Sequence, residues 1–203
     1  MKPYPIPLAF TPDQATGYIC NEGTQRYLLE AESTSGYTCW RLADGTNLIS
    51  ESIQVSLPAS EFVDFWPCAG YQDMSPAGRI TSFDCHGNGI IVFCPERLCG
   101  LEYLDCSYNL IRDLTLDGLT ELQSLNVSNN QLRNLKVRGL KSLRMLNCSD
   151  DHLWDLDVSG LEALEILDAS GNLLDTFLHD GCTSLRDVKV VMNPKSTQSS
   201  TNT

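Results

Sequence analysis

Four residues near the middle of the chain have types and spacing that could support hydrolysis. Asp84 and His86 are followed, 21 residues later, by Asp105 and Ser107. A serine beside a histidine and a carboxylate is the arrangement that activates a nucleophile. However, serine recurs at this spacing in four consecutive units, and no nucleophile elbow or oxyanion loop accompanies it. We therefore expect no enzyme activity, and a hydrolase using His86 and Ser107 is the weakest alternative.

A second set of polar residues recurs with the same spacing and could bind a ligand directly. It comprises Asp84, Asp105, Asn126, Asn147 and Asp168. Neighbouring carboxylates a few ångströms apart repel by about 1 kcal/mol in water. A cation, a ligand hydroxyl or a partner's Lys or Arg would relieve this repulsion, so three interpretations stay open: a cation site, a protein or glycan contact strip, and a solvated consensus position.

No metal or cofactor is expected from the cysteines. Cys94 and Cys99 are the only close pair of the nine cysteines, and no second pair completes a zinc set. Cys85, Cys106 and Cys148 share one place in the repeat with Val127 and Ala169. That exchange indicates packing by reduced thiols.

These residues belong to a repeat of 21 residues that positions them. Its first position is occupied by Leu101, Leu122, Leu143, Leu164 and Leu185, and the segment from Ile80 fits one unit earlier. The unit reads L-x-x-L-x-(C/V/A)-S-x-(N/D)-x-(L/I)-x-x-L-x-(V/L)-x-G-L-x-x. Because one unit is too short to bury its own apolar side chains, the period predicts stacked units with a continuous core.

The blocks LEYLDCSYNLI, LQSLNVSNNQL, LRMLNCSDDHL and LEILDASGNLL resemble bacterial leucine-rich repeats. The resemblance covers about residues 80–193. It implies a mainly β solenoid of about six units, with a parallel sheet on the concave face and short extended or 3₁₀ segments on the convex side. It also implies a non-catalytic binding module, although the fold serves many kinds of binding.

Strand alternation assigns the repeat positions to the inside or the outside. Positions four and six should point inward and positions three, five and seven outward. The expected ligand-binding residues of the concave face are Asp84, His86, Tyr103, Asp105, Tyr108, Asn126, Met145, Asn147, Ile166 and Asp168. Position nine should turn inward and bond backbone groups at each bend, giving a structural ladder of Asn88, Asn109, Asn130, Asp151, Asn172 and Asn193.

The chain divides into three expected parts. Residues 1–78 should form a small antiparallel β module capping the solenoid, with strands near 26–31, 37–42 and 52–57, a hairpin turn at Asp44-Gly45, and the aromatic segment 62–67 against the first unit. Residues 79–193 should form the solenoid, and residues 194–203, rich in Ser, Thr and Asn, a disordered tail.

Charge and hydrophobicity narrow the partners. With 26 acidic and 14 basic residues the net charge is -12, which disfavours nucleic acid. No apolar stretch suits a signal peptide or a membrane span, so we expect a cytoplasmic or virion-associated protein, at the cell surface only if a signal was removed. The last unit lacks a cap, so self-association through this end is expected as one option. A phage or phage-like adhesive component is the main alternative to a stand-alone protein-binding or glycan-binding module.

Overall fold

The computed structural model describes residues 17–21, 25–33, 38–41, 47–49, 52–57, 62–70, 73–76, 79–96 and 98–193. Before residue 79, side chains are described for Glu30 and Glu32. The described chain is mainly β and contains no helix, and therefore no helix that could cross a membrane. The expected turn at Asp44-Gly45 and the expected tail at 194–203 lie outside these residues.

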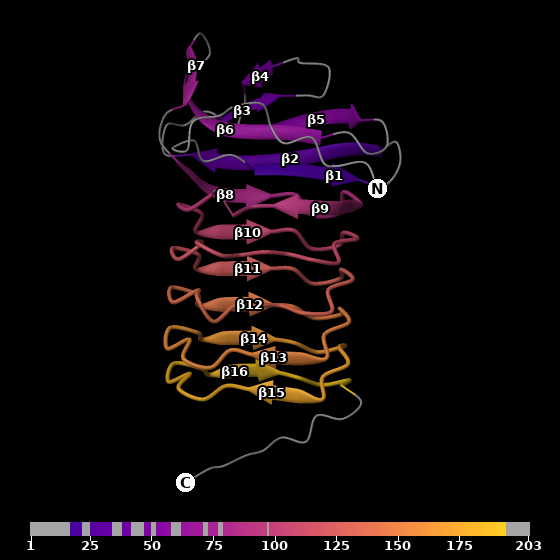
Figure 1. Cartoon of the computed structure of the whole chain (residues 1–203), viewed down its shortest axis with the longest axis vertical. Coiled ribbons are helices and arrows are strands. Elements are labelled where there is room, and N and C mark those ends of the chain that lie inside the picture. Colours follow the sequence, from indigo (N-terminus) through magenta and orange to yellow (C-terminus); the bar gives the residue numbers. More distant parts are fainter. Residues whose placement is uncertain are drawn as a thin grey trace.

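The repeats stack into a solenoid whose longest axis is vertical in Figure 1. One short strand per unit runs parallel to that of the next unit, and the register places Leu104 opposite Leu125 and Leu125 opposite Leu146. These strands are β8 (Ile80–Asp84), β10 (Tyr103–Asp105), β11 (Ser124–Asn126), β12 (Met145–Asn147), β14 (Ile166–Asp168) and β16 (Asp187–Lys189). Their outward surface, together with the residues that follow each strand up to position eight, is called the strand face below.

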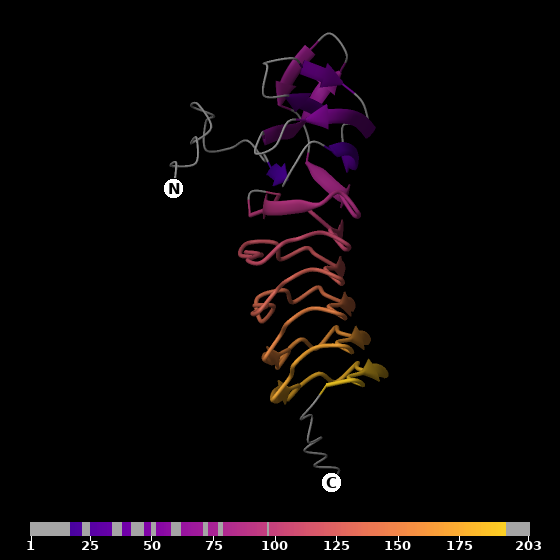
Figure 2. The ribbon, with the colours of Figure 1, turned by 90° about the vertical axis from the view of Figure 1, so that its right-hand side faces the viewer.

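The opposite side of the solenoid, the turn face, carries β9 (Ile90–Cys94), β13 (Asp155–Asp157) and β15 (Thr176–Leu178), and Figure 2 shows the two sides in profile. In each unit, pairs of turns closed by bonds between residues three apart return the chain to the strand face. The Leu119 amide donates to Leu116 over 3.2 Å and the Leu122 amide to Leu119 over 3.1 Å. The expectation of extended or 3₁₀ segments on this side is confirmed.

The core is the continuous column of repeat leucines between the two faces. Leu101, Leu122, Leu143 and Leu164 are fully buried. The leucines at position four of the same units are at most 2% exposed. Position six is buried in every unit, whether Cys, Val or Ala occupies it. Burial of a Leu side chain contributes roughly 1.5–3 kcal/mol, so the stacked units stabilise one another through this column.

The position-nine residues bond the backbone at each bend. The Asn109 amide Nδ2 donates to the Cys106 carbonyl over 2.9 Å and to the Cys85 carbonyl of the preceding unit over 3.0 Å. Its Oδ1 accepts from the Ile90 amide over 2.9 Å. Because one side chain satisfies backbone groups in two units, the ladder links each repeat to the one before it.

The strands before residue 79 continue both sides of the solenoid. They are β1 (Gly17–Asn21), β2 (Gln25–Ser33), β3 (Thr38–Arg41), β4 (Asn47–Ile49), β5 (Ser52–Leu57), β6 (Phe62–Gly70) and β7 (Asp73–Pro76). β2 pairs antiparallel with β8, and β5 follows β2, so the strand-face sheet has eight strands. β1 pairs antiparallel with β9 in a second sheet, in the order β4-β3-β6-β1-β9.

This junction differs in one detail from the expectation for residues 62–67. The strands that pair with the first unit are β1 and β2, and β6 lies one strand further away, beyond β1. The reason is that β8 and β9 each have an edge whose backbone groups need hydrogen-bond partners. β2 and β1 supply these partners by pairing antiparallel with β8 and β9.

Candidate binding face

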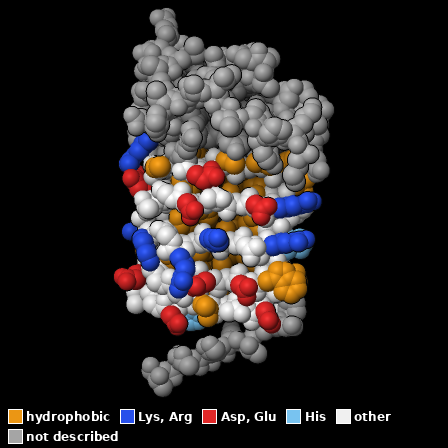
Figure 3. All heavy atoms as spheres, viewed as in Figure 1, with side chains coloured by type: hydrophobic (Ala, Val, Ile, Leu, Met, Phe, Trp, Pro, Cys, Tyr) orange, Lys and Arg blue, Asp and Glu red, His pale blue; other side chains and the backbone are white. Residues whose placement is uncertain are grey.

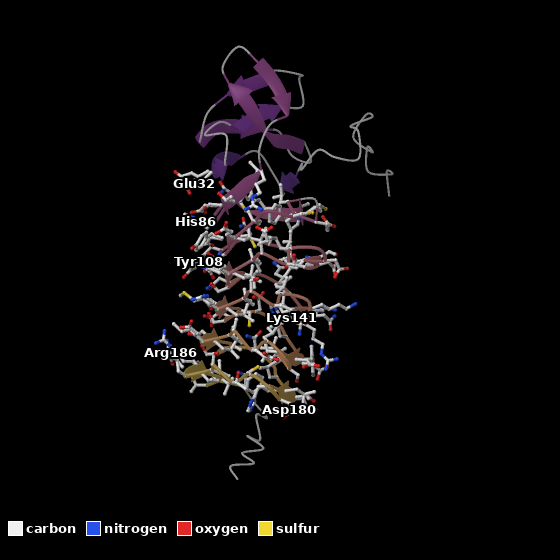
Figure 4. All side chains as sticks on the ribbon, turned by 90° about the vertical axis from the view of Figure 1, so that its left-hand side faces the viewer. Glu32, His86, Tyr108, Lys141, Asp180 and Arg186 are labelled. Carbon is white, nitrogen blue, oxygen red and sulfur yellow. The ribbon has the colours of Figure 1, made fainter. Side chains whose placement is uncertain are left out.

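The expected ligand-binding residues lie together on the strand face. Asp84, Asp105, Asn126, Asn147 and Asp168 form one column across adjacent strands, in direct register from β8 to β14. Tyr103, Met145 and Ile166 occupy the column two residues earlier, and His86 and Tyr108 follow the strands. In Figure 4, Glu32, His86, Tyr108 and Arg186 project from this side, and Lys141 and Asp180 from the opposite side.

The expectation that position seven points outward is wrong for three units. Ser107, Ser128 and Ser149 are buried. The Ser107 backbone amide and hydroxyl both donate to Asp105 Oδ1, over 2.9 and 2.6 Å. The chain bends just after this position, and the serine folds back onto position five. The face therefore presents carboxylates and amides, and the hydroxyls of Ser107 and Ser128 bond position five within the bend.

The side chains at position five form hydrogen bonds within the repeats in addition to lying on the surface. Besides accepting from Ser107, Asp105 accepts at Oδ2 from Asn126 Nδ2 over 2.9 Å. In the fifth strand of the column, Asp168 Oδ2 lies 3.5 Å from Lys189 Nζ. Burial opposes ionisation there, but the hydrogen bonds from Ser170 and the Lys189 charge together lower the pKa of Asp168. Among the described residues, no group of three or more metal-ligating side chains comes together.

The four residues considered for hydrolysis form two separate pairs. His86 Nδ1 lies 2.6 Å from Asp84 Oδ1 within its own unit, and this hydrogen bond raises the pKa of His86. Ser107 donates its hydroxyl hydrogen to Asp105 rather than to the histidine. In the described geometry, the histidine and the serine are thus hydrogen-bonded to two different aspartates. Activation of a serine nucleophile instead requires a hydrogen bond between its hydroxyl and the histidine.

Two acidic residues join this face from the preceding module. β2 aligns Glu30 with Asp84 and Glu32 with Ser82, and both glutamates are exposed. Because Asp84 in turn aligns with Asp105, three carboxylates run in a row across β2, β8 and β10. Sequence reasoning missed Glu30 and Glu32, because the repeat carries no information about how β2 registers on β8.

Two tyrosines border this row of carboxylates. Tyr103 is 50% exposed and stands between the small residues Ser82 and Ser124 of the neighbouring strands. Tyr108 is 64% exposed and has a positive φ of 53°. All six residues at position eight have positive φ: Gly87, Tyr108, Asn129, Asp150, Gly171 and Met192. Gly, Asn and Asp tolerate this conformation, so Tyr108 occupies it at a cost.

The far half of the strand face has a different charge balance. Glu165 lies 2.7 Å from Arg186 and 3.6 Å from Arg144, and Lys189 lies near Asp168. In the first half, His86 lies beside Asp84, and no described residue forms an ion pair with Glu30 or Glu32. Among the described residues, Lys and Arg therefore pair with the acidic side chains at the far end, whereas beside the tyrosines the pairing partner is His86.

The turn face, which Figure 3 shows, is mixed. Acidic and basic side chains alternate over it with apolar side chains between them. Arg138 pairs with Asp157 over 3.1 Å, and Lys141 donates to the Gly160 carbonyl over 2.9 Å. Trp154 is 55% exposed just before β13. From residue 79 to residue 193, the acidic and basic side chains of this face are interspersed, so the strand face is the better candidate for selective binding.

The comparisons with known proteins agree with this geometry. Residues 121–143 match the leucine-rich repeat family. The functional domain of InlJ from Listeria monocytogenes is similar to this chain, with 35% identity and a TM-score of 0.53. Together, the family match and the likeness to InlJ support a bacterial-type leucine-rich repeat solenoid for the described repeats. This fold is typically a non-catalytic binding scaffold.

The likeness to InlJ covers 55% of this chain and 25% of that chain. The chain thus spans about a quarter of the length of the structure it matches. That domain includes a cysteine ladder, and here Cys85 and Cys106 are neighbours in the position-six column, with Cys148 beyond Val127. No curated protein matches the chain.

Proposed function

We propose that this protein is a recognition module that binds a partner protein through the first half of the strand face, using Tyr103 and Tyr108 beside the carboxylates of Glu30, Asp84 and Asp105. The partner segment would be basic, because its Lys or Arg side chains would neutralise a row of carboxylates and stack on the tyrosine rings. Tyrosines with this exposure are frequent energetic centres of protein interfaces.

The observation that carries this proposal is Tyr108 itself. It holds a left-handed backbone conformation that costs a non-glycine residue about 1–2 kcal/mol, at a place where four of the five other units use Gly, Asn or Asp and the last uses Met. Its side chain is mostly exposed, so packing within the chain does not repay that cost. Strain of this kind concentrates where a side chain serves binding.

A glycan is the second candidate ligand. Asn126 and Asn147 add amides to the carboxylate column, in direct register with each other. Amides, carboxylates and tyrosine rings together can bond sugar hydroxyls and cover sugar ring faces. The same residues would then contact the glycan, and the ligand would need no positive charge.

A peptide-display selection on the intact chain tests the proposal. Random peptides are selected on the wild type alone, and the affinity of each enriched peptide is then measured for the wild type and for the double variant Tyr103→Ser, Tyr108→Asn. We expect enriched peptides rich in Lys or Arg, with affinity at least tenfold weaker for the double variant. Trp154→Ala, on the turn face, is the matched control and should leave affinity unchanged.

Two results would contradict the protein proposal. The first is a set of selected peptides that bind the double variant as well as the wild type. The second is specific glycan binding on an array, lost in the double variant, with no peptide enriched. The second result would assign the same face to carbohydrate.

A further inference from the structure

We infer that the outer edge of β16 pairs with β16 of a second copy of this chain, antiparallel and centred on Val188, so that two solenoids join end to end. This inference concerns a surface distant from the proposed binding face and does not depend on the proposed function.

The first observation is a step in burial along one core column. Leu146 and Leu167, at position four, are 1% and 0% exposed, whereas Val188 at the same position is 42% exposed. Phe177 and Leu185 are only partly buried against the core. Apolar side chains that fill the core elsewhere are thus presented at this edge, together with Val191 and Met192.

The second observation is the direction of the backbone hydrogen bonds. Amides at positions six and eight donate to the following unit: Ala169 to the Lys189 carbonyl over 2.7 Å and Gly171 to the Val191 carbonyl over 3.0 Å. In the last described unit these positions are Val190 and Met192. Their amides face the edge, where the described residues place no further strand. An edge of this kind is a template for another strand.

The third observation identifies the occupant through charge. β16 reads Asp187–Val188–Lys189, and the two charged side chains lie on the same face of the strand because they are two residues apart. In an antiparallel pair centred on Val188, Asp187 of one copy faces Lys189 of the other, and the reverse contact follows by symmetry. The strand is therefore its own complement, as a two-fold interface requires.

The opposite end of the solenoid shows that antiparallel addition suits this architecture. There β2 adds antiparallel to β8 on the strand face, and β1 adds antiparallel to β9 on the turn face. Figure 2 shows that both sides also reach the far end, where β16 and β15 lie on opposite sides. A two-fold axis through Val188 would pair β16 with β16 and bring β15 toward β15 in the same step.

Light scattering behind a sizing column on the intact chain tests this inference, using Asp187→Lys and Lys189→Glu. Wild type should show a dimer mass that falls on dilution. Each single variant places like charges opposite one another, so each should be a monomer at concentrations where wild type is a dimer. An equimolar mixture restores both opposite-charge contacts and should recover the dimer mass. Circular dichroism and thermal melting verify that both variants are folded.

Three outcomes would overturn the inference. One is a wild type that is monomeric at every concentration. This outcome overturns the inference even if removal of residues 194–203 produces a dimer, because those residues would then block the edge of β16 in the intact chain. Another is a dimer that neither variant weakens or that the mixture fails to restore. The last is a trimer, which a two-fold β16 pair cannot form and which would favour the phage-like adhesive component.

Discussion

The Ser107 hydroxyl donates a 2.6 Å hydrogen bond to Asp105 Oδ1, two residues earlier in the same unit. The Ser107 amide donates to the same oxygen over 2.9 Å. One carboxylate oxygen thus closes the bend after β10, and the other accepts from Asn126 on β11. The position-five column therefore stabilises the repeats and also lies on the surface that we propose for binding.

Asp105→Ala should lower the free energy of unfolding by about 1–3 kcal/mol, because the half-buried donors of Ser107 lose their acceptor. Asp105→Asn keeps an acceptor oxygen and should cost less. Urea denaturation followed by circular dichroism measures both changes, with Glu162→Ala, an exposed residue of the turn face, as the control. Equal losses for Ala and Asn would show that charge, and not the hydrogen bonds, is what matters at Asp105.

Asp151 is the one acid in the position-nine ladder, and its Oδ2 is buried without a hydrogen-bond partner. Burial raises its pKa to about 7, against hydrogen bonds from Leu132 and Asn130 that lower it. Asp151→Asn should raise the free energy of unfolding by about 1–3 kcal/mol at neutral pH, because the amide can donate where the carboxylate cannot. The exposed Asp155 supplies the control substitution, Asp155→Asn, which should change little.

The same residue predicts a pH dependence. The folded-state pKa of about 7 lies above the ordinary 3.8, so the folded chain holds this proton more tightly, and stability falls as pH rises from about 4 to about 7. His86, whose pKa is also raised, contributes a loss of the same sign. The difference between wild type and Asp151→Asn isolates Asp151: it should grow with pH across this window. A difference that is constant with pH would contradict the assignment.

The position-six thiols should be unreactive in the folded chain. Burial raises the pKa of Cys85, Cys106 and Cys148, so almost no thiolate forms and reagents cannot reach it. Iodoacetamide labelling followed by peptide mass spectrometry should modify the exposed Cys99 within minutes and the three buried cysteines only after denaturant is added. Rapid native labelling of Cys106 would show that the core opens locally.

Tyr108→Asn should separate stability from binding. Because Asn tolerates positive φ better than Tyr, the free energy of unfolding of the variant should equal that of the wild type or exceed it by up to about 1 kcal/mol. Urea denaturation measures this difference. The same substitution should weaken a selected basic peptide. Loss of stability together with loss of binding would instead indicate that Tyr108 packs within the chain.

The sequence predicts the solenoid well because residues that are one period apart lie side by side in neighbouring units. Leu104, Leu125 and Leu146 stand in register as the spacing requires. The left-handed backbone at position eight was missed, although Gly87, Asn129 and Gly171 in one column were a usable signal. The burial of Ser107 was missed because strand alternation stops applying where the chain bends.

The candidate site could be predicted only in part. The tyrosines and the carboxylates of β8 and β10 belong to the repeat and follow from its columns. Glu30 and Glu32 come from a module without a period, and their place depends on the register of β2 on β8. Pairing between two different modules leaves no repeated spacing in the sequence to read.

Hydrogen exchange with mass spectrometry, with and without a selected basic peptide, tests the central claim most directly. The account predicts slower exchange at β2, at β8 and in the segment from Tyr103 to Asn109, and weakening of that protection by the double variant Tyr103→Ser, Tyr108→Asn. Unchanged exchange there, with protection at β13 and β15 on the turn face, would contradict it.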